Sequence, residues 1–570
     1  MTLSLATKAN WRRLKTDPAE KLQHGANKTR SSRKIYPMEY LRHKENLSFV
    51  EKVLAIVQKN ALLPENTIYT IACLFLEQHN ILHQKHVKNV LNQYDWSFEK
   101  ELAAIKDIPL DEWDILGFLY QCMQSEGRKN RSGSYYTPES VVKDIVKDHT
   151  IADGKKILDP ACGSGSFLLA FDTRYPELLF GCDNDEIAVF IARINLLCKY
   201  KEHEFVPQIY CLDFLTEECC GLLTQKFDCI AGNPPWGAKN KKHNNIIYNK
   251  VKDTFSLFLL KSYSLLKDNG KLSFLLPQAV LNVKTHKYIR SFMIKECCLE
   301  SIEYISGKFT GVMTDYVNIK LRKAAAAERF IISENGRTTQ VKSCDVLADT
   351  DHILSYKSEL DEKLIKKIDQ QKKYDLSESI FALGIVTGDN KTKLSDTPKK
   401  NYEAVYTGKD VKQYTLSSPG KYIFYDRTQL QQVAKDEYYR AGEKLVYKFI
   451  SKELVFAYDN SGSLLLNSAN MLIPQIDELS IKTILALLNS NVLRYYYKVR
   501  FTDVKILKGN LIQLPLPYIS KALQQEFETM VNQLLTGNIS DHAGLQDLIY
   551  KCYELSEDDI IYIKSVLLQP

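Results

Sequence analysis

Four short apolar runs near the middle of the chain each end in an acidic or amide residue, and helical patterns separate the runs. They end at Asp159, Asp183, Asp213 and Asn233. Strand signals that alternate with helical signals predict βαβ units, in which parallel strands lie buried between helices. Because the carboxyl ends of parallel strands meet at one edge of a sheet, where ligands bind, we expect these four residues to converge on one site.

The first run, ILDPACGSGSF, places a turn with two glycines directly after Asp159. Gly163 and Gly165 permit a tight turn with close approach of the backbone to a ligand, and a helix is expected from Ser166. The third glycine of the dinucleotide fingerprint is missing. Taken alone, the turn is therefore also consistent with simple helix packing.

The next two strand ends suit the parts of a nucleoside. Asp183, 24 residues after Asp159, can bind the two hydroxyls of a ribose, while Asp213 can accept from an exocyclic amine and Phe214 can stack on a ring. A single acidic strand end could be a helix cap. Three in succession predict a pocket for a cationic, nucleoside-bearing cofactor, and S-adenosylmethionine has that shape and charge, with Asp159 at its α-amino group.

The fourth run ends in Asn233-Pro234-Pro235-Trp236. Consecutive prolines exclude a helix and an interior strand, so we expect a stiff, extended turn that presents an amide, carbonyl groups and an aromatic face. The loop that follows is rich in lysine. Both contact with nucleic-acid phosphates and a solvated surface turn remain open interpretations of that loop.

Periodicity and charge divide the chain into six expected parts: a basic arm, a helical domain, an α/β catalytic domain, a charged bridge, an α+β domain rich in aromatic and basic residues, and C-terminal helices, at residues 1–35, 36–125, 126–325, 326–373, 374–520 and 521–570. The arm carries nine Lys or Arg against two acidic residues. A phosphate-binding arm, an organellar transit peptide and a solubilising tail all remain open for it.

Other features exclude whole classes of protein. No apolar run reaches the roughly 18 residues that span a bilayer, so we expect a soluble protein without a membrane partner. The thirteen cysteines contain no CxxC pair, which argues against a disulfide framework and a zinc site. We therefore expect no metal, and a reducing, cytoplasmic location.

In these motifs and their order the chain resembles the class I S-adenosylmethionine-dependent methyltransferases, and among them the gamma-class, TaqI-type N6-adenine DNA methyltransferases. The resemblance covers about residues 114–517. It is carried by the segments YYTP (Tyr135 to Pro138), DPACGSG (Asp159 to Gly165), Asp183, Asp213-Phe214, NPPW (Asn233 to Trp236) and Phe309 in KFTGV. As in that family, the Thr-Pro element precedes the glycine turn, the NPP element follows it, and a recognition domain comes last.

The resemblance implies a Rossmann-like α/β fold with a mostly parallel, seven-stranded sheet, a helical N-terminal domain and an α+β C-terminal target-recognition domain. It also implies methyl transfer from S-adenosylmethionine to N6 of an adenine flipped out of double-stranded DNA, in restriction-modification or epigenetic marking. A location on the nucleoid would follow if the source is bacterial.

The resemblance further assigns roles to individual residues. The catalytic residues would be Asn233, Pro234, Pro235 and Trp236, with Trp236 and Phe309 stacking on the target base, although a plain core aromatic remains open for Phe309. The cofactor residues would be Tyr136, Thr137, Pro138, Asp159, Ala161, Cys162, Gly163, Gly165, Asp183, Asn184, Asp213 and Phe214. The DNA contacts would be Lys239, Lys241, Lys242, Lys409, Arg500 and Lys505.

Three alternatives use the same motifs. A protein-glutamine methyltransferase also activates an amide nitrogen with an NPP turn, but lacks the Tyr-Tyr-Thr-Pro element and a long C-terminal domain. An RNA-adenine methyltransferase would prefer single-stranded or hairpin RNA. A binding module without activity conflicts with the intact Asn233, Asp159 and Gly163. The sequence lacks a convincing nuclease pattern, which leaves room for a separate restriction endonuclease, and it indicates no partner subunit.

Overall fold

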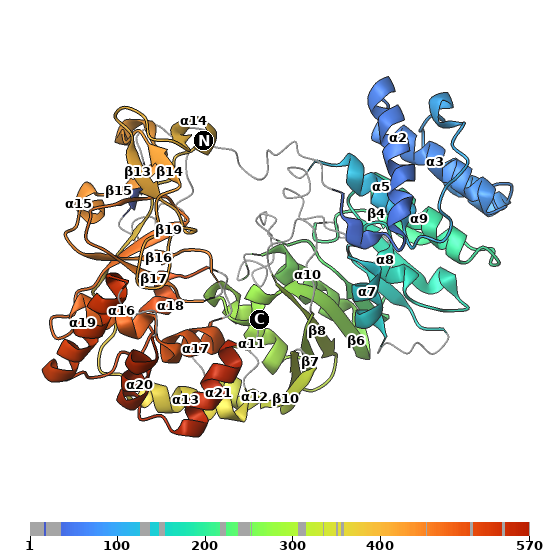
Figure 1. Ribbon diagram of the computed structural model, residues 1–570. Coiled ribbons are helices and arrows are strands. Elements are labelled where there is room, and N and C mark those ends of the chain that lie inside the picture. The colour runs from blue at the N-terminus through green and yellow to red at the C-terminus, as the bar shows by residue number, and fades with distance from the viewer. Residues whose placement is uncertain are drawn as a thin grey trace. The chain divides into compact units, whose positions relative to one another are not determined.

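The computed structural model describes residues 16–18, 36–125, 137–147, 154–216, 224–236, 251, 253–305, 315–334, 336–348, 352–354, 358–451, 453–501, 505–537 and 542–568. The chain divides into two compact units. We call Lys28–Tyr356 the sheet unit, and Lys357–Pro570 together with Met1–Asn27 the C-terminal unit (Figure 1). Within the described residues, no helix is long and apolar enough to cross a membrane.

The sheet unit is built on a sheet of nine strands in the order β10-β9-β7-β8-β6-β5-β2-β3-β4. The strands are β2 (Ile157–Asp159), β3 (Leu179–Asp183), β4 (Gln208–Cys211), β5 (Phe227–Gly232), β6 (Leu266–Pro277), β7 (Cys298–Tyr304), β8 (Tyr316–Arg322), β9 (Arg329–Glu334) and β10 (Arg337–Lys342). Strands β4, β3, β2, β5 and β6 are parallel, and β8 lies antiparallel between β6 and β7. The seven strands from β2 to β8 confirm the predicted α/β class with a mostly parallel sheet.

The direction of chain progress reverses at β2. From there β3 and β4 follow on one side of the sheet, whereas β5 and β6 lie on the other. The loops that leave β2 and β5 therefore diverge at the carboxyl edge, which is where open α/β sheets bind their ligands.

Both faces of the central strands β2, β3 and β5 are buried, and successive strand residues point to opposite faces. Ile157 belongs to one apolar cluster and its neighbour Leu158 to another. The first cluster is completed by helices α5 (Ile115–Met123), α7 (Glu139–Val146), α8 (Ser166–Leu169) and α9 (Glu186–Lys199), and the second by α10 (Thr254–Leu265) and α11 (Lys287–Lys295). Burial on both faces explains why the strands read as continuous apolar runs.

The stretch expected as a bridge, residues 326–373, contributes to both units. Strands β9 and β10 extend the sheet beyond β7, and α12 (Ser343–Ala348) follows them. In β9, Phe330 and Ile332 are buried while Arg329 and Ile331 are exposed. The remaining helix of the stretch, α13 (Glu359–Gln370), belongs to the C-terminal unit.

The helical segment before the sheet shares its core with the sheet. It contains α2 (Leu47–Asn60), α3 (Pro64–Gln78), α4 (Lys85–Leu91) and α5. Three aromatic rings surround Phe190 of α9, with centroid distances of 5.9 Å for Tyr69, 4.9 Å for Tyr94 and 5.1 Å for Trp96. A single apolar cluster thus runs from the helical segment into one face of the sheet.

The C-terminal unit contains two four-stranded sheets. One is formed by β11 (Ile380–Leu383), β19 (Ala469–Ile473), β16 (Lys444–Lys448) and β17 (Phe456–Asp459), and the other by β12 (Leu394–Ser395), β14 (Lys421–Ile423), β13 (Glu403–Tyr406) and β18 (Leu464–Leu465). Near the start of the chain, β1 (Thr16–Pro18) pairs antiparallel with β15 (Gln432–Ala434) of this unit.

Helices complete the C-terminal unit. They are α13, α14 (Asn390–Lys393), α15 (Asp436–Tyr439), α16 (Ile481–Leu488), α17 (Asn491–Arg500), α18 (Lys508–Leu511), α19 (Lys521–Leu535), α20 (Ala543–Cys552) and α21 (Glu557–Leu567). Capping boxes start α13 and α21, where the serine side chain and the aspartate three residues later satisfy each other's backbone N–H groups. Tyr495, Tyr496 and Tyr497 of α17 are buried in the core between these helices.

Candidate active site

The glycine turn after β2 is a tight loop around a buried carboxylate. Gly163 and Gly165 have φ angles of +52° and +92°, which residues with a Cβ rarely adopt. A Cβ on Gly165 would also lie 3.3 Å from Cβ of Ala192 on α9, so glycine permits close packing of the loop on that helix. Asp159 is 1% exposed, and the backbone N–H of Ala161 donates to its Oδ1 at 3.1 Å.

The end of β5 lies directly against Asp159. A Cβ built on Gly232, the last residue of β5, would lie 2.5 Å from Oδ1 of Asp159, so a larger residue would collide with the carboxylate. Asn233 follows Gly232 in the chain. The structure therefore brings the predicted cofactor turn and the predicted catalytic turn together at the carboxyl edge of the sheet.

Asp183, at the end of β3, is tied to the glycine turn. Its Oδ2 accepts from the backbone N–H of Gly163 at 2.9 Å, and its Oδ1 accepts from the backbone N–H of Asp185 at 3.0 Å. Asp185 caps α9 by accepting from Ile187 at 3.1 Å. Thus the acidic strand end and the helix cap, which sequence reasoning treated as alternatives, are two different residues, Asp183 and Asp185.

Burial raises the pKa values of Asp159, Cys162 and Asp183, which lie in or beside the loops after β2 and β3. It raises the pKa of Asp159 from 3.8 to about 8, an effect that the Asp183 carboxylate reinforces, and it raises the pKa of Asp183 to about 6. Burial also raises the pKa of the Cys162 thiol well above its usual value, which keeps it protonated. Two buried carboxylates with raised pKa values would be ionised more readily beside a cationic ligand. The site therefore fits the predicted positively charged cofactor.

The predicted adenine residues after β4 lie in different environments. Asp213 is partly buried and accepts from the backbone N–H of Leu215 at 3.0 Å. Phe214 is only 2% exposed, because its ring stacks on Phe258 at 5.1 Å and Lys261 lies over it. Stacking of Phe214 on a cofactor ring would therefore require the phenyl group to leave the core of the sheet unit.

The amide of Asn233 is oriented by the Thr-Pro element. Its Nδ2 donates to Oγ1 of Thr137 at 3.1 Å, and Thr137 is buried just before α7. Because Nδ2 of Asn233 faces Thr137, the amide oxygen Oδ1 is directed to the side away from Thr137. Residues 96 positions apart in sequence thus form one unit.

Trp236 is held against the strands beside it. Its indole N–H donates to the backbone oxygen of Leu275 in β6 at 3.3 Å, and its ring lies 6.3 Å from Tyr316 at an angle of 37°. Burial raises the pKa of Tyr316 to about 12, so the phenol is neutral. Sequence reasoning missed Tyr316; its position at the start of an antiparallel strand, which begins at the carboxyl edge, is the signal that could have identified it.

The helical segment also supports the glycine turn after β2 and the loop after β3. Sequence reasoning did not predict this support. Asp114 caps α5 and accepts from Asn195 at 2.7 Å and from the hydroxyl of Ser164 in the glycine turn. The hydroxyl of Tyr120 donates to Asp185 at 2.7 Å. Burial raises the pKa of Asp114, although these hydrogen bonds act in the opposite direction.

The remaining predicted site residues are either outside the described residues or in the C-terminal unit. Tyr136, Phe309, Lys239, Lys241 and Lys242 are outside the described residues. The three predicted DNA contacts in the C-terminal unit are an exposed Lys409 in the turn after β13, Arg500 at the end of α17 and an exposed Lys505. The guanidinium of Arg500 lies 5.8 Å from the ring of Tyr496.

Comparison with known families matches both units. Residues 111–382 match the family described as N-6 DNA Methylase, and residues 403–516 match the TaqI-like C-terminal specificity domain. The chain is 30% identical over 349 residues to the Type II methyltransferase M.VspI of Vibrio sp. (strain 343), covering 58% of this chain and 83% of that protein. It is 26% identical over 301 residues to the Type I restriction enzyme EcoEI methylase subunit of Escherichia coli, covering 48% and 58%.

Among solved structures, the chain is similar to the Type IIL restriction-modification enzyme MmeI in complex with DNA. The TM-score is 0.54 at 13% identity, and the match covers 92% of this chain and 94% of that one. At this identity the likeness concerns the fold, and it extends over both units.

Proposed function

The chain belongs to the N-6 DNA methylase family, and we propose that it is a site-specific methyltransferase which modifies N6 of adenine in double-stranded DNA. The observation that supports this most is the closeness of two strand ends. Gly232 leaves only the space of a hydrogen atom beside Asp159, so that Asn233 begins directly next to the buried carboxylate. A cofactor held at Asp159 and an amine held at Asn233 would therefore be neighbours.

The cofactor of this family is S-adenosylmethionine, which supplies a methyl group on a positively charged sulfur. The buried, acidic loops described above suit a cation, and the tight turn at Gly163 suits close approach of the backbone. We propose that Asp159 binds the α-amino group and Asp183 the ribose, with Asp213 beside the adenine ring. The other proposed cofactor residues are Tyr136, Thr137, Pro138, Ala161, Cys162, Gly163, Gly165 and Asn184, together with Phe214, whose ring would have to leave its packing on Phe258 to reach the cofactor.

The Asn-Pro-Pro turn would activate the acceptor. The exocyclic amine of adenine is a poor nucleophile because its lone pair is delocalised into the ring. Oδ1 of Asn233 and the carbonyl oxygen of Pro234 would each accept a hydrogen bond from one N–H of the amine and so localise its lone pair toward the methyl donor. Positioning and electrostatic stabilisation would then account for most of the rate enhancement.

The target base would have to leave the duplex to reach this turn. Trp236 follows Asn233 by three residues, and its half-buried indole is anchored by Leu275 and Tyr316. We propose that the anchored ring provides one stacking face for the flipped base, with Phe309 on the other side. Anchoring would keep the ring in place when no base is bound.

The specificity domain supports DNA as the substrate, over the protein-glutamine and RNA alternatives. We propose that Lys409, Arg500 and Lys505 of the C-terminal unit, with Lys239, Lys241 and Lys242 of the sheet unit, contact the DNA backbone. The protein would act in the cytoplasm, on the nucleoid of a bacterium, in restriction-modification or epigenetic marking. A cognate endonuclease would then be a separate protein.

The test is to incubate the purified protein with S-adenosylmethionine and unmodified genomic DNA, and to quantify methylated nucleosides by mass spectrometry. We expect N6-methyladenine from the wild type. Asn233→Ala should produce almost none while it still binds the cofactor in calorimetry. Asn92→Ala, at an exposed position after α4, is the matched control and should remain active.

Two outcomes would change the proposal. N4-methylcytosine in place of N6-methyladenine would correct the target base. Full activity of Asn233→Ala would contradict the proposed role of the amide.

A further inference from the structure

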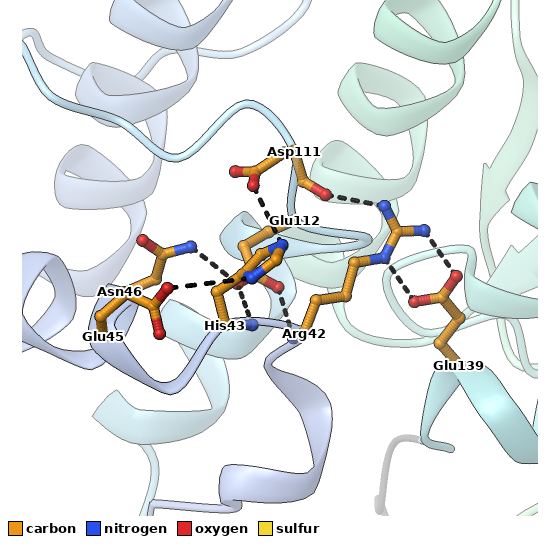
Figure 2. A network of polar contacts seen from close by, with 7 residues as sticks. All are labelled: Arg42, His43, Glu45, Asn46, Asp111, Glu112 and Glu139. Carbon is orange, nitrogen blue, oxygen red and sulfur yellow. Dashed lines mark hydrogen bonds and ion pairs between the residues drawn. The ribbon is translucent and has the colours of Figure 1, made fainter.

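Arg42, in the segment before α2, forms a two-pronged ion pair with Glu139 at the start of α7 (Figure 2). Its Nε donates to Oε2 at 2.6 Å and its Nη2 to Oε1 at 2.5 Å. Nη1 also donates to the backbone oxygen of Asp111 at 2.7 Å. A planar guanidinium with both carboxylate oxygens engaged fixes orientation as well as distance.

The Arg42 end of this pair is itself held in place. Glu112, which is only 7% exposed, accepts from the backbone N–H of Arg42 at 2.8 Å and from that of His43 at 3.0 Å (Figure 2). The side-chain amide of Asn46 donates to the same carboxylate at 2.8 Å. The arginine therefore projects from a backbone that is fixed relative to the helical segment.

The Glu139 end is held as firmly. Lys143, one turn further along α7, pairs with Glu139 at 2.6 Å. The cationic groups of Arg42 and Lys143 lie 5.6 and 5.2 Å from the ring of Trp113, which favours both charges. Burial alone would raise the pKa of Glu139, but the hydrogen bonds from Arg42 and Lys143 hold it below its usual value. The carboxylate is thus ionised at neutral pH.

Glu139 lies only two residues after Thr137, which accepts the hydrogen bond from Nδ2 of Asn233. We propose that Arg42 is a positioning residue for methyl transfer: by fixing Glu139 it fixes Thr137, and through Thr137 the amide of Asn233. The inference rests on the proposed role of Asn233. It gives the helical segment a function in the chemical step, in addition to its packing against α9.

The physical basis is geometric. Arg42 and Glu139 side chains are 38% and 16% exposed, and ion pairs this close to solvent contribute little to stability. A displaced amide, by contrast, slows the reaction steeply, because misplacement of a catalytic group by about 1 Å can reduce a rate by on the order of 100-fold. The pair should therefore affect the methyl-transfer rate more than the melting temperature.

The experiment measures single-turnover methyl transfer from tritiated S-adenosylmethionine to unmodified genomic DNA, using the full chain with enzyme and cofactor saturating. Arg42→Ala should lower the transfer rate about tenfold, and Arg42→Lys, which keeps the charge without the fork, should recover part of the loss. The matched control is Arg322→Ala, which removes a 2.7 Å Arg–Glu pair between β8 and β7 whose arginine is as exposed as Arg42, and should leave the rate unchanged.

A double-mutant cycle tests the route through Thr137. Thr137→Val should lower the rate by itself, and Arg42→Ala added to it should have little further effect, because both act on the same amide. Multiplicative effects of the two substitutions, or a wild-type rate in Arg42→Ala, would overturn the inference. Absence of methyl transfer by the wild type, in contrast, would count against the proposed function itself.

Discussion

The two units both bury carboxylates, but they treat the charge in opposite ways. In the C-terminal unit Asp459 is 3% exposed and pairs with the fully buried Lys444 at 2.5 Å, and Ser461 and Ser463 donate to it as well. Burial alone would raise the pKa of Asp459, but these partners lower it. In the sheet unit the pKa values of Asp159 and Asp183 are raised. The lowered pKa of Asp459 reflects a charge already paired within the scaffold, whereas the raised pKa values of Asp159 and Asp183 suit a cation that comes from outside.

The largest expected effect on stability comes from removing the cation of the Lys444–Asp459 pair. Lys444→Met leaves the Asp459 carboxylate buried without its cation, which should destabilise the region around β16 and β17 by about 3–5 kcal/mol. Hydrogen exchange of peptides from these two strands would report the change. Binding of S-adenosylmethionine should be unaffected.

Two further variants limit the interpretation of that result. Asp459→Asn combined with Lys444→Met should restore most of the protection, since it removes the orphaned charge. Lys435→Met, at the exposed pair with Glu437, should leave exchange unchanged. Normal protection in Lys444→Met alone would show that the two units do not differ in the way described.

The same kind of change at Asp159 should have the reverse effect on stability. At pH 8, Asp159→Asn is expected to stabilise the protein without cofactor by roughly 1–3 kcal/mol, because it removes a charge that folding desolvates. It should weaken binding of S-adenosylmethionine by about tenfold to 100-fold, since a charge-assisted hydrogen bond is lost. Denaturant unfolding and calorimetry measure the two quantities.

The pH dependence provides a check on sign. The pKa of Asp159 is about 8 in the folded protein and 3.8 as its ordinary value, so the folded state without cofactor binds the extra proton between these limits. Stability without cofactor should rise as the pH falls from 8 toward 4, while affinity for the cationic cofactor falls over the upper part of the same range. Asp159→Asn should lose this part of both profiles; a wild-type profile in that variant would refute the assignment.

The smallest expected effects on stability come from removing one buried tyrosine hydroxyl in each unit. Tyr120 donates to Asp185 and Tyr553 donates to the backbone oxygen of Pro515, both at 2.7 Å and from buried side chains. Replacing either by phenylalanine should reduce stability by about 1 kcal/mol. Only Tyr120→Phe should also weaken cofactor binding, by about threefold, because Asp185 belongs to the Asp183 loop. Equal cofactor affinity in the two variants would contradict a supporting role of α5.

Sequence reasoning located the candidate residues that a local pattern marks. Asp159 and Asp183 end β2 and β3, and Asn233 directly follows β5; such strand ends are predictable from an apolar run and its polar stop. Their convergence then follows from the parallel topology. The sheet itself could be predicted for the same reason, since its buried strands read as apolar runs.

The contacts that were missed join residues distant in sequence. Tyr120 reaches Asp185 across 65 residues, and Arg42 reaches Glu139 across 97. Local pattern carries no signal for such pairs. Local pattern also could not predict the packing of Phe214. A phenylalanine after a strand can stack on another core ring, here Phe258, as well as on a ligand. Strand β9 was taken for part of a bridge because the stretch around it is rich in Lys, Glu and Asp.

The pairing of β1 with β15 has a consequence for protein engineering. Thr16 aligns with Ala434 and Pro18 with Gln432, so the beginning of the chain completes a structure whose remainder lies after residue 357. A chimera that grafts the specificity module of a relative onto this catalytic scaffold should therefore exchange both ends of the chain together. Transplanting only the part after residue 357 would leave the donor's β15 beside a foreign β1, and the junctions to choose are those near residues 27 and 357.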